Sequence, residues 1–199
     1  MFNLTAFLSY VVVVTYTPGP NNIMSMANAS QYGFKKTLRF MFGVLTGGFF
    51  LVLSSCYFNL LLFNLIPRIK TVMGIIGAAY MMYLAIKIMK SKPSGDNDNK
   101  GSLNFKTGVL LQFINPKFLL YAVTVTSNFI VPYYNSHFQL IMFSAFLAVT
   151  GFSSLALWAL FGSGFKKFLS DYHRPFNIAM GLLLMYSAIS ISGIMHMFK

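Results

Sequence analysis

Long hydrophobic stretches, separated by short polar segments, follow one another along the whole chain. No residue is charged from Phe40 to Pro67, and the same holds from Phe138 to Phe165. A helix of about 20 predominantly apolar residues crosses the hydrocarbon core of a bilayer. The pattern therefore predicts an all-α integral membrane protein.

Six membrane-spanning helices account for this pattern, and a polar motif at residues 17–22 interrupts the first of them. The predicted spans are Leu4–Ala29, Phe40–Ile66, Ile69–Met89, Thr107–Val131, Phe138–Phe161 and Phe176–Phe198. A polar segment at residues 91–105 separates two sets of three spans. We therefore expect a first three-helix repeat (residues 1–90), a cytoplasmic linker and a second three-helix repeat (residues 106–199).

Charged residues are few, and they orient the predicted spans. Only 9% of the residues are charged, against roughly 25% in ordinary soluble domains. The net charge of +12 would suggest nucleic acid in a soluble protein, but here the bases lie at the junctions between spans. With the N-terminus outside, most bases fall on the inner side: Lys35, Lys36, Arg39, Lys87, Lys90, Lys92, Lys100, Lys106, Lys166, Lys167 and Arg174. This positive-inside bias predicts the lipid bilayer, and no nucleic acid, as the partner.

The two halves carry traces of an internal repeat. MYLAIKI at residues 82–88 and MYSAISI at residues 185–191 are identical at five of seven positions. Because each half has three spans, the halves insert in opposite senses. The repeat is therefore predicted to be inverted, with broken first and fourth helices.

The two helix breaks are the main candidate for chemistry. Thr17-Pro18-Gly19-Pro20-Asn21-Asn22 interrupts the first span, and Asn115-Pro116-Lys117 interrupts the fourth. Proline lacks an N–H group and clashes with the carbonyl four residues earlier. The freed carbonyls cannot face lipid and would suit an ammonium, whereas helix N-termini and a lysine would suit a carboxylate. A zwitterion would use both sets; the alternative is that each proline only kinks its helix.

We expect the two breaks to meet in one substrate site near the bilayer midplane. The predicted substrate-binding residues are Pro18, Gly19, Pro20, Asn21, Asn22, Gln112, Asn115, Pro116, Lys117, Tyr121 and Thr124. Lys117 is the strongest candidate for substrate binding, because ionisable groups at membrane depth are usually functional. The alternative is that it lies near the inner end of its span and snorkels to the interface.

Weaker patterns leave two interpretations open. Hydroxyl groups recur at spacings of three, at Tyr121, Thr124 and Ser127, so they lie roughly on one helix face. They would either line a path for the substrate or form hydrogen bonds within the helix. Gly43 and Gly47 form a small-xxx-small pattern, which is typical of close helix packing within one chain or in a homodimer.

The sequence offers little for catalysis. It has no glutamate, and its three aspartates lie outside the predicted spans. Carboxylate pairs, metal-ligand clusters and nucleophiles with an adjacent base are the usual catalytic signatures. We therefore expect no catalytic residue, no metal and no cofactor, with a membrane-embedded enzyme as the alternative.

Several motifs resemble the LysE/RhtB family of bacterial amino-acid exporters over nearly the whole chain. They are the residue 17–22 motif, Gly33-Phe34 with the bases that follow, Gly77-Ala78-Ala79-Tyr80, and Gln112 to Lys117. The run from Asn115 to Ser127 is similar to the branch that exports cysteine and O-acetylserine. The resemblance implies gradient-driven efflux across the bacterial inner membrane, with a coupling proton whose carrier residue cannot be matched.

The charged residues of the predicted spans then restrict the class of substrate that we expect. A cationic amino acid would place a second positive charge beside Lys117, with no intramembrane acid to balance it. We therefore expect a small neutral amino acid or derivative whose carboxylate meets Lys117. Exporters of homoserine-, threonine- or leucine-like amino acids are the alternative.

Overall fold

The computed structural model describes residues 2–59, 104–164 and 172–192, together with separate positions between Ile75 and Lys90. Within these ranges every regular element is a helix. The elements are α1 (Leu4–Tyr16), α2 (Pro20–Tyr32), α3 (Phe34–Tyr57), α5 (Phe105–Ile114), α6 (Pro116–Val125), the π-helix η1 (Thr126–Ile130), α7 (His137–Gly164) and α9 (His173–Ser192). The predicted all-α class is confirmed for the described part of the chain.

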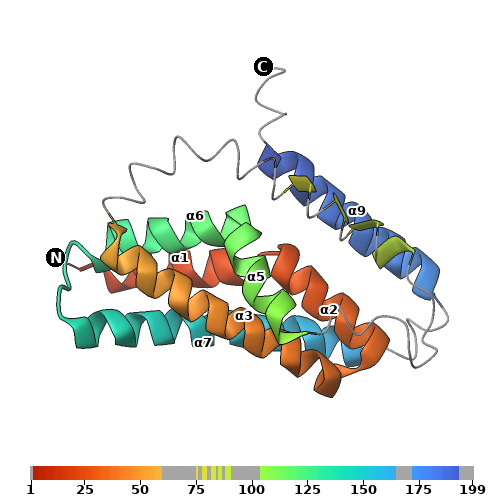
Figure 1. Ribbon diagram of the computed structural model, residues 1–199, viewed down its shortest axis with the longest axis horizontal. Helices are drawn as coiled ribbons and strands as arrows, with labels where there is room; N and C mark the ends of the chain where they lie inside the picture. The colour runs from red at the N-terminus through yellow and green to blue at the C-terminus, as the bar shows by residue number, and fades with distance from the viewer. Residues whose placement is uncertain are drawn as a thin grey trace.

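Two long helices form the frame on which the broken helices lie. Helices α3 and α7 pack against each other, α2 packs along α7, and α5 packs along α3 (Figure 1). The broken helix of each half thus lies on the long helix of the other half. This cross-packing brings segments far apart in the sequence into contact, such as Gly43 with Phe105 and Gly162 with Met26.

The described helices include membrane-capable segments. By length and composition α3 and α7 can each cross a bilayer, and α5 with α6–η1 qualifies as one span bent by 68°. Helix α1 is also apolar, but it is shorter. The predicted spans Ile69–Met89 and Phe176–Phe198 fall partly outside the described residues, as does the motif at residues 82–88, so the six-helix count and the inverted repeat stay predictions.

The second span begins earlier than the sequence predicted. We placed its start at Phe40, but α3 begins at Phe34, directly after Gly33. Gly33 has φ 86°, a backbone conformation that glycine adopts without strain, so the chain turns sharply and restarts a helix at once. Lys35 and Lys36 consequently belong to the first turn of α3 and not to a loop. Helix α3 ends at Tyr57, and residues 60–66 of the predicted span lie outside the described residues.

Small residues allow α3 and α5 to approach closely. A Cβ on Gly43 would lie 2.1 Å from the Phe105 carbonyl oxygen, and one on Gly108 would lie 2.3 Å from the Phe40 carbonyl oxygen. The small-xxx-small pattern therefore packs within the chain, which accounts for it without a homodimer. The same close contact seats Gln112, one turn beyond Gly108, against α3.

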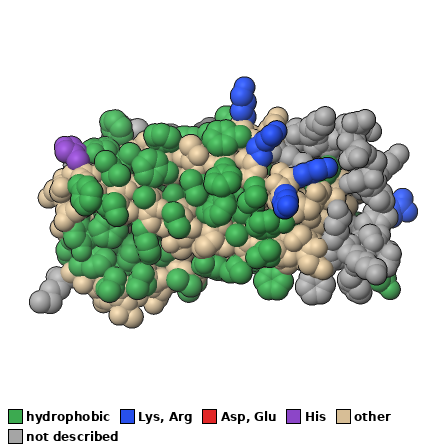
Figure 2. Space-filling model, turned by 90° about the horizontal axis from the view of Figure 1, so that it is seen from below, with side chains coloured by type: hydrophobic (Ala, Val, Ile, Leu, Met, Phe, Trp, Pro, Cys, Tyr) green, Lys and Arg blue, Asp and Glu red, His purple; other side chains and the backbone are tan. Residues whose placement is uncertain are grey.

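The surface is apolar along the helices and basic toward one end. Large hydrophobic side chains on α7 are exposed, among them Phe138, Met142 and Val149. Figure 2 shows hydrophobic side chains over much of one face, with Lys and Arg gathered toward one end. An apolar band with charges displaced to an end is the surface expected of a protein in a bilayer.

The core has two parts with a cavity between them. One hydrophobic cluster includes Ile23, Phe40 and Leu155, and the other includes Phe7 and Leu147. Residues of both clusters line the same cavity, which also receives both helix breaks. The fold therefore places the polar breaks at the junction of two apolar cores.

Candidate functional site

Both breaks interrupt their helices fully. Helix α1 ends at Tyr16, the backbone at Thr17 and Gly19 is extended, and α2 restarts with Pro20 as its first residue. In the second break Asn115 alone separates α5 from α6, which restarts with Pro116. Proline suits the first position of a helix, where its missing N–H would have no partner. Each break thus ends one helix and starts the next with a proline. The alternative interpretation, in which each proline only kinks a continuous helix, is therefore wrong.

Side chains of α2 and α7 donate hydrogen bonds to the carbonyl oxygens that are freed at the first break. Asn22 Nδ2 donates to the carbonyl oxygens of Thr15, at 3.1 Å, and Thr17, at 3.0 Å. Ser154 Oγ of α7 also donates to Thr15 O at 3.0 Å, and Trp158 Nε1 donates to the carbonyl of Tyr16 at 3.3 Å. We expected these carbonyls to be open to an ammonium, but the protein uses them to hold the break against α7.

Lys117 joins the two breaks. Its Nζ donates to the carbonyl oxygens of Thr17, at 2.7 Å, and Pro18, at 3.4 Å. A Cβ on Gly19 would lie 2.9 Å from Lys117 Cδ and 3.0 Å from its Nζ, so glycine leaves room for the lysine. The side chain therefore reaches the break of the other half, and the depth of Lys117 in the membrane stays a prediction.

The two breaks differ in how their following helices are capped. Asn115 Oδ1 accepts from the backbone N–H groups of Lys117, at 3.1 Å, and Phe118, at 3.4 Å, and so caps α6. Helix α2, which follows Gly19, has no side-chain cap. The positive end of α2, near Asn21, is therefore the one better placed to meet a negative group.

An amide pair links the two halves across the cavity. Asn21 Nδ2 donates to Gln112 Oε1 at 2.5 Å. Gln112 is almost fully buried, at 1% exposure, and it packs against Gly47 and Gly48 of α3. Because Gln112 is held by this packing, the amide pair fixes the separation of the two breaks.

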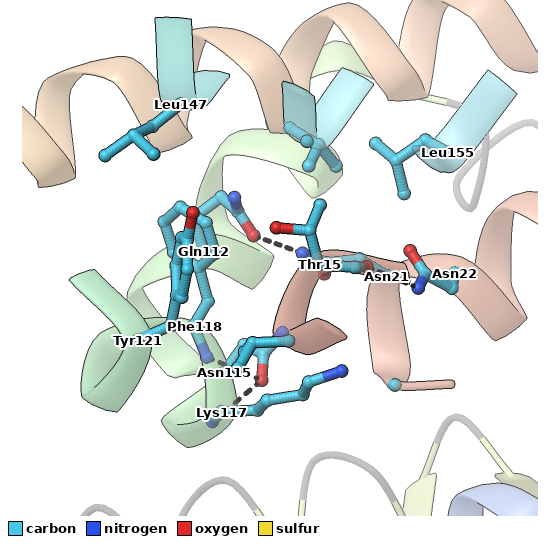
Figure 3. Close-up of a pocket in the computed structure, with 14 residues that line it drawn as sticks. Thr15, Asn21, Asn22, Gln112, Asn115, Lys117, Phe118, Tyr121, Leu147 and Leu155 are labelled. Atoms are coloured by element: carbon cyan, nitrogen blue, oxygen red, sulfur yellow. Dashed lines mark hydrogen bonds between the residues drawn. The ribbon is translucent and has the colours of Figure 1, made fainter. Parts of the chain in front are cut away.

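One cavity collects these groups. About 60 Å³ is open to the centres of water molecules, several times the roughly 10–15 Å³ that one water needs. Its polar lining consists of Thr15, Asn21, Asn22, Gln112, Asn115, Lys117 and Tyr121. Its apolar lining includes Val14, Val44, Phe118, Leu147 and Leu155. Figure 3 shows Leu147 and Leu155 on one side of the Asn21–Gln112 pair and Lys117 on the other.

Most predicted site residues line this cavity. Gly19, Asn21, Asn22, Gln112, Asn115, Lys117 and Tyr121 do so. Pro18, Pro20 and Pro116 shape the breaks without lining the cavity. Thr124 also lies outside the lining, and its side chain pairs with Tyr10. Residues of both breaks therefore line one cavity, whereas a position near the bilayer midplane and substrate binding by these residues stay predictions.

The expected row of hydroxyls ends after Tyr121. Ser127 falls in the π-helix η1, where hydrogen bonds run from residue i to i+5 and the spacing of three no longer marks one face. Its Oγ accepts from Asn59 Nδ2 at 2.8 Å, beside Thr126. This hydroxyl therefore belongs to a contact between η1 and the end of α3.

Sequence reasoning missed the cavity residues contributed by α1 and α7. Thr15 directly precedes the first break, so its position was a signal that we did not use. Leu147, Gly151 and Leu155 of α7 look like any residues of an apolar span. Only the packing of α2 on α7 distinguishes them.

A cavity lined by polar residues of two broken helices inside an apolar bundle is an arrangement typical of membrane-embedded transporters. Among the residues that the structure describes, no group of three or more His, Cys, Asp or Glu is placed to hold a metal ion. The chain belongs to the family described as LysE type translocator, whose model matches residues 12–192. Membership in a translocator family indicates a transporter rather than an enzyme.

Three curated relatives share one name. The chain is 35% identical over 188 residues to a cysteine/O-acetylserine efflux protein of Klebsiella pneumoniae, covering 94% of this chain and 96% of the relative. It is 35% identical over 191 residues to the protein of that name in Salmonella typhimurium, with the same coverage. The relative of that name in Escherichia coli K12 is 33% identical over 188 residues, again with 94% and 96% coverage. No solved structure matches the chain.

Proposed function

We propose that this protein is a secondary transporter that exports a small neutral amino acid or derivative, of the cysteine or O-acetylserine kind, across the bacterial inner membrane. The observation that carries the proposal is the cavity between the two breaks, which holds one cation and uncharged polar groups and is closed on one side by apolar residues. Relatives named cysteine/O-acetylserine efflux protein, at 33% to 35% identity over 94% of the chain, support the substrate class.

The substrate carboxylate belongs at Lys117 in this proposal. Lys117 is the only charged side chain in the described cavity lining, and the uncapped start of α2 lies directly after Gly19. An ammonium and a helix N-terminus both stabilise a negative group. A lysine-like substrate would add a second cation with no acid in the lining to offset it.

The substrate side chain belongs against α3 and α7. Leu147 and Leu155 of α7 supply apolar surface on one side of the cavity, and Val44 of α3 also lines it. The limited space between two packed hydrophobic clusters suits a short side chain. A mercaptomethyl or acetyl-ester side chain fits these surroundings better than a longer one.

We further propose that the chain crosses the membrane six times, as inverted repeats at residues 1–90 and 106–199, with the linker at residues 91–105 in the cytoplasm. The cross-packing of α2 on α7 and of α5 on α3 supports the repeat. Export is driven by an ion gradient, with the proton as the coupling ion. The coupling ion rests on the family resemblance alone.

A transport assay tests the proposed function. Purified protein is reconstituted in sealed vesicles, and movement of L-cysteine (kept reduced), O-acetyl-L-serine and L-lysine is followed with and without an imposed proton gradient. We expect gradient-dependent movement of the two neutral compounds and competition between them. Robust lysine transport, or no movement of either neutral compound, would contradict the proposal.

A further inference from the structure

Three side-chain oxygens in the cavity have no hydrogen-bond partner of normal geometry. They are Thr15 Oγ1, Asn21 Oδ1 and Tyr121 Oη, and each atom is buried. Tyr121 as a whole is only 5% exposed. Buried polar atoms are nearly always paired, and leaving one unpaired is costly. Three such atoms in the lining of one cavity therefore mark a place where a ligand with hydrogen-bond donors is expected.

The three oxygens come from three helices and both halves of the chain. Thr15 lies at the end of α1, Asn21 in the first turn of α2 and Tyr121 in α6. Figure 3 shows Thr15 on the side of the Asn21–Gln112 pair that faces Leu147, away from Lys117. The Thr15 and Tyr121 hydroxyls lie close to each other, although neither has a hydrogen-bond partner of normal geometry. All three oxygens belong to residues that line the same cavity.

Neighbouring contacts hold these oxygens in place. Asn21 uses its Nδ2 on Gln112, which leaves Oδ1 as a free acceptor of fixed orientation. The Tyr121 ring stacks on Tyr10, with ring centroids 6.0 Å apart, and packs against Phe118 at 5.8 Å. A site whose acceptors are held before binding loses less entropy when a ligand arrives.

Two backbone carbonyls of the first break do not compete for the same ligand. Thr15 O accepts from Asn22 and Ser154, and Thr17 O accepts from Asn22 and Lys117. A carbonyl oxygen has two lone pairs, so both of these oxygens are fully engaged. The three unpaired side-chain oxygens have no such donors and can accept from an incoming cationic group.

We propose that Thr15, Asn21 and Tyr121 form the subsite that binds the α-ammonium of the transported amino acid. An ammonium has three N–H donors and no acceptor, which matches three uncharged oxygens. This proposal rests on the proposed function, and it orients the substrate across the Asn21–Gln112 pair with its carboxylate at Lys117. Recognition of the ammonium by neutral oxygens would also exclude compounds whose amine is acylated.

Substrate fragments test the subsite. Binding of labelled L-cysteine to the purified full-length protein under reducing conditions is competed with 3-mercaptopropionate, which lacks the amine, and with cysteamine, which lacks the carboxylate. Hydrogen bonds to charged groups imply roughly a tenfold loss for each oxygen removed. The double variant Thr15→Val, Tyr121→Phe should therefore weaken L-cysteine and cysteamine at least tenfold and leave 3-mercaptopropionate unchanged. Lys117→Met should weaken L-cysteine and 3-mercaptopropionate and spare cysteamine.

Matched controls separate this subsite from a general loss of structure. Thr46→Val and Tyr57→Phe remove hydroxyls that bond outside the cavity, to Phe42 O and to His137, and should leave all three affinities unchanged. The subsite is overturned if the double variant weakens L-cysteine and 3-mercaptopropionate by the same factor, or weakens neither. No binding of L-cysteine by the native protein overturns the proposed function, and the subsite with it.

Discussion

At the scale of single residues, Lys117 and Gly19 work as a pair. The lysine ammonium bonds to Thr17 and Pro18 on the opposite break, and the missing side chain of Gly19 leaves the space that the lysine occupies. A cation inside an apolar helix bundle is costly unless it is hydrogen-bonded. Hydrogen bonds to the carbonyls of the broken helix thus stabilise the lysine ammonium. The ammonium is in turn a positive charge in the cavity lining.

Removal of the Lys117 charge should strongly reduce the rate of export. Lys117→Met keeps most of the side-chain volume but loses the ammonium, so we expect at least a tenfold fall in the export rate, on the order expected for a charged hydrogen bond. The measurement is L-cysteine flux in vesicles containing equal amounts of inserted protein. Unchanged flux in this variant would show that Lys117 has no role in the site.

Gly19→Ala provides a companion test that keeps the charge. Its Cβ would lie 2.9 Å from Lys117 Cδ, so the lysine must shift, and we expect a smaller loss of flux than in Lys117→Met. Gly164→Ala is the matched control, because a Cβ there meets nothing within 4 Å. Equal flux in the two alanine variants would contradict the pairing of Gly19 with Lys117.

At the scale of elements, the breaks let short helices end inside the bundle. Helix α6 begins under the cap of Asn115, whereas α2 begins without a side-chain cap. The positions of both starts depend on how the broken helices lie on the long ones, and α5 lies close to α3. Gly43 and Gly108 make this contact from the two sides.

Enlarging Gly108 should destabilise the α3–α5 contact. In Gly108→Ala the added Cβ would lie 2.3 Å from the Phe40 carbonyl oxygen, and backbone cannot yield as a flexible side chain can. Overpacking of this kind costs about 1–3 kcal/mol, so we expect a lower thermal midpoint in detergent. Gly151→Ala, where a Cβ meets nothing within 4 Å, should not lower it. A midpoint for Gly108→Ala as high as that of the native protein would show that the two helices are less close than described.

At the scale of the whole molecule, the distribution of charge decides the orientation. The exposed surface of the long helices is apolar, and the described Lys and Arg gather toward one end (Figure 2). Basic residues are retained on the cytoplasmic side of a bacterial inner membrane. The basic end is therefore expected inside, and the exposed loop at Asn135, between η1 and α7, is expected outside.

Cysteine labelling in intact cells tests this orientation. The buried Cys56 is first replaced by alanine, and single cysteines are then introduced as Asn135→Cys and Asn97→Cys. A membrane-impermeant thiol reagent should label position 135 from outside and reach position 97 only after the cells are opened. The reverse pattern would overturn the topology.

The sequence by itself determined where the helices break and what class of protein this is. The breaks follow from local covalent chemistry, because Pro20 and Pro116 cannot donate an N–H group wherever the chain lies. The membrane class follows from the length of the apolar runs, which needs no knowledge of contacts. The same local reasoning correctly selected Asn21, Gln112 and Lys117 as members of one cavity.

Only the tertiary structure decided which partners these groups have. Ser154 and Trp158 of α7 bond to carbonyls of the first break, over separations of 139 and 142 residues, and nothing in an apolar span marks them for that role. The unpaired state of the Thr15 and Tyr121 hydroxyls likewise depends on which atoms come near them. Hydrogen bonding and packing between distant segments depend on how the helices lie against each other, and a one-dimensional pattern of apolar residues does not specify this arrangement.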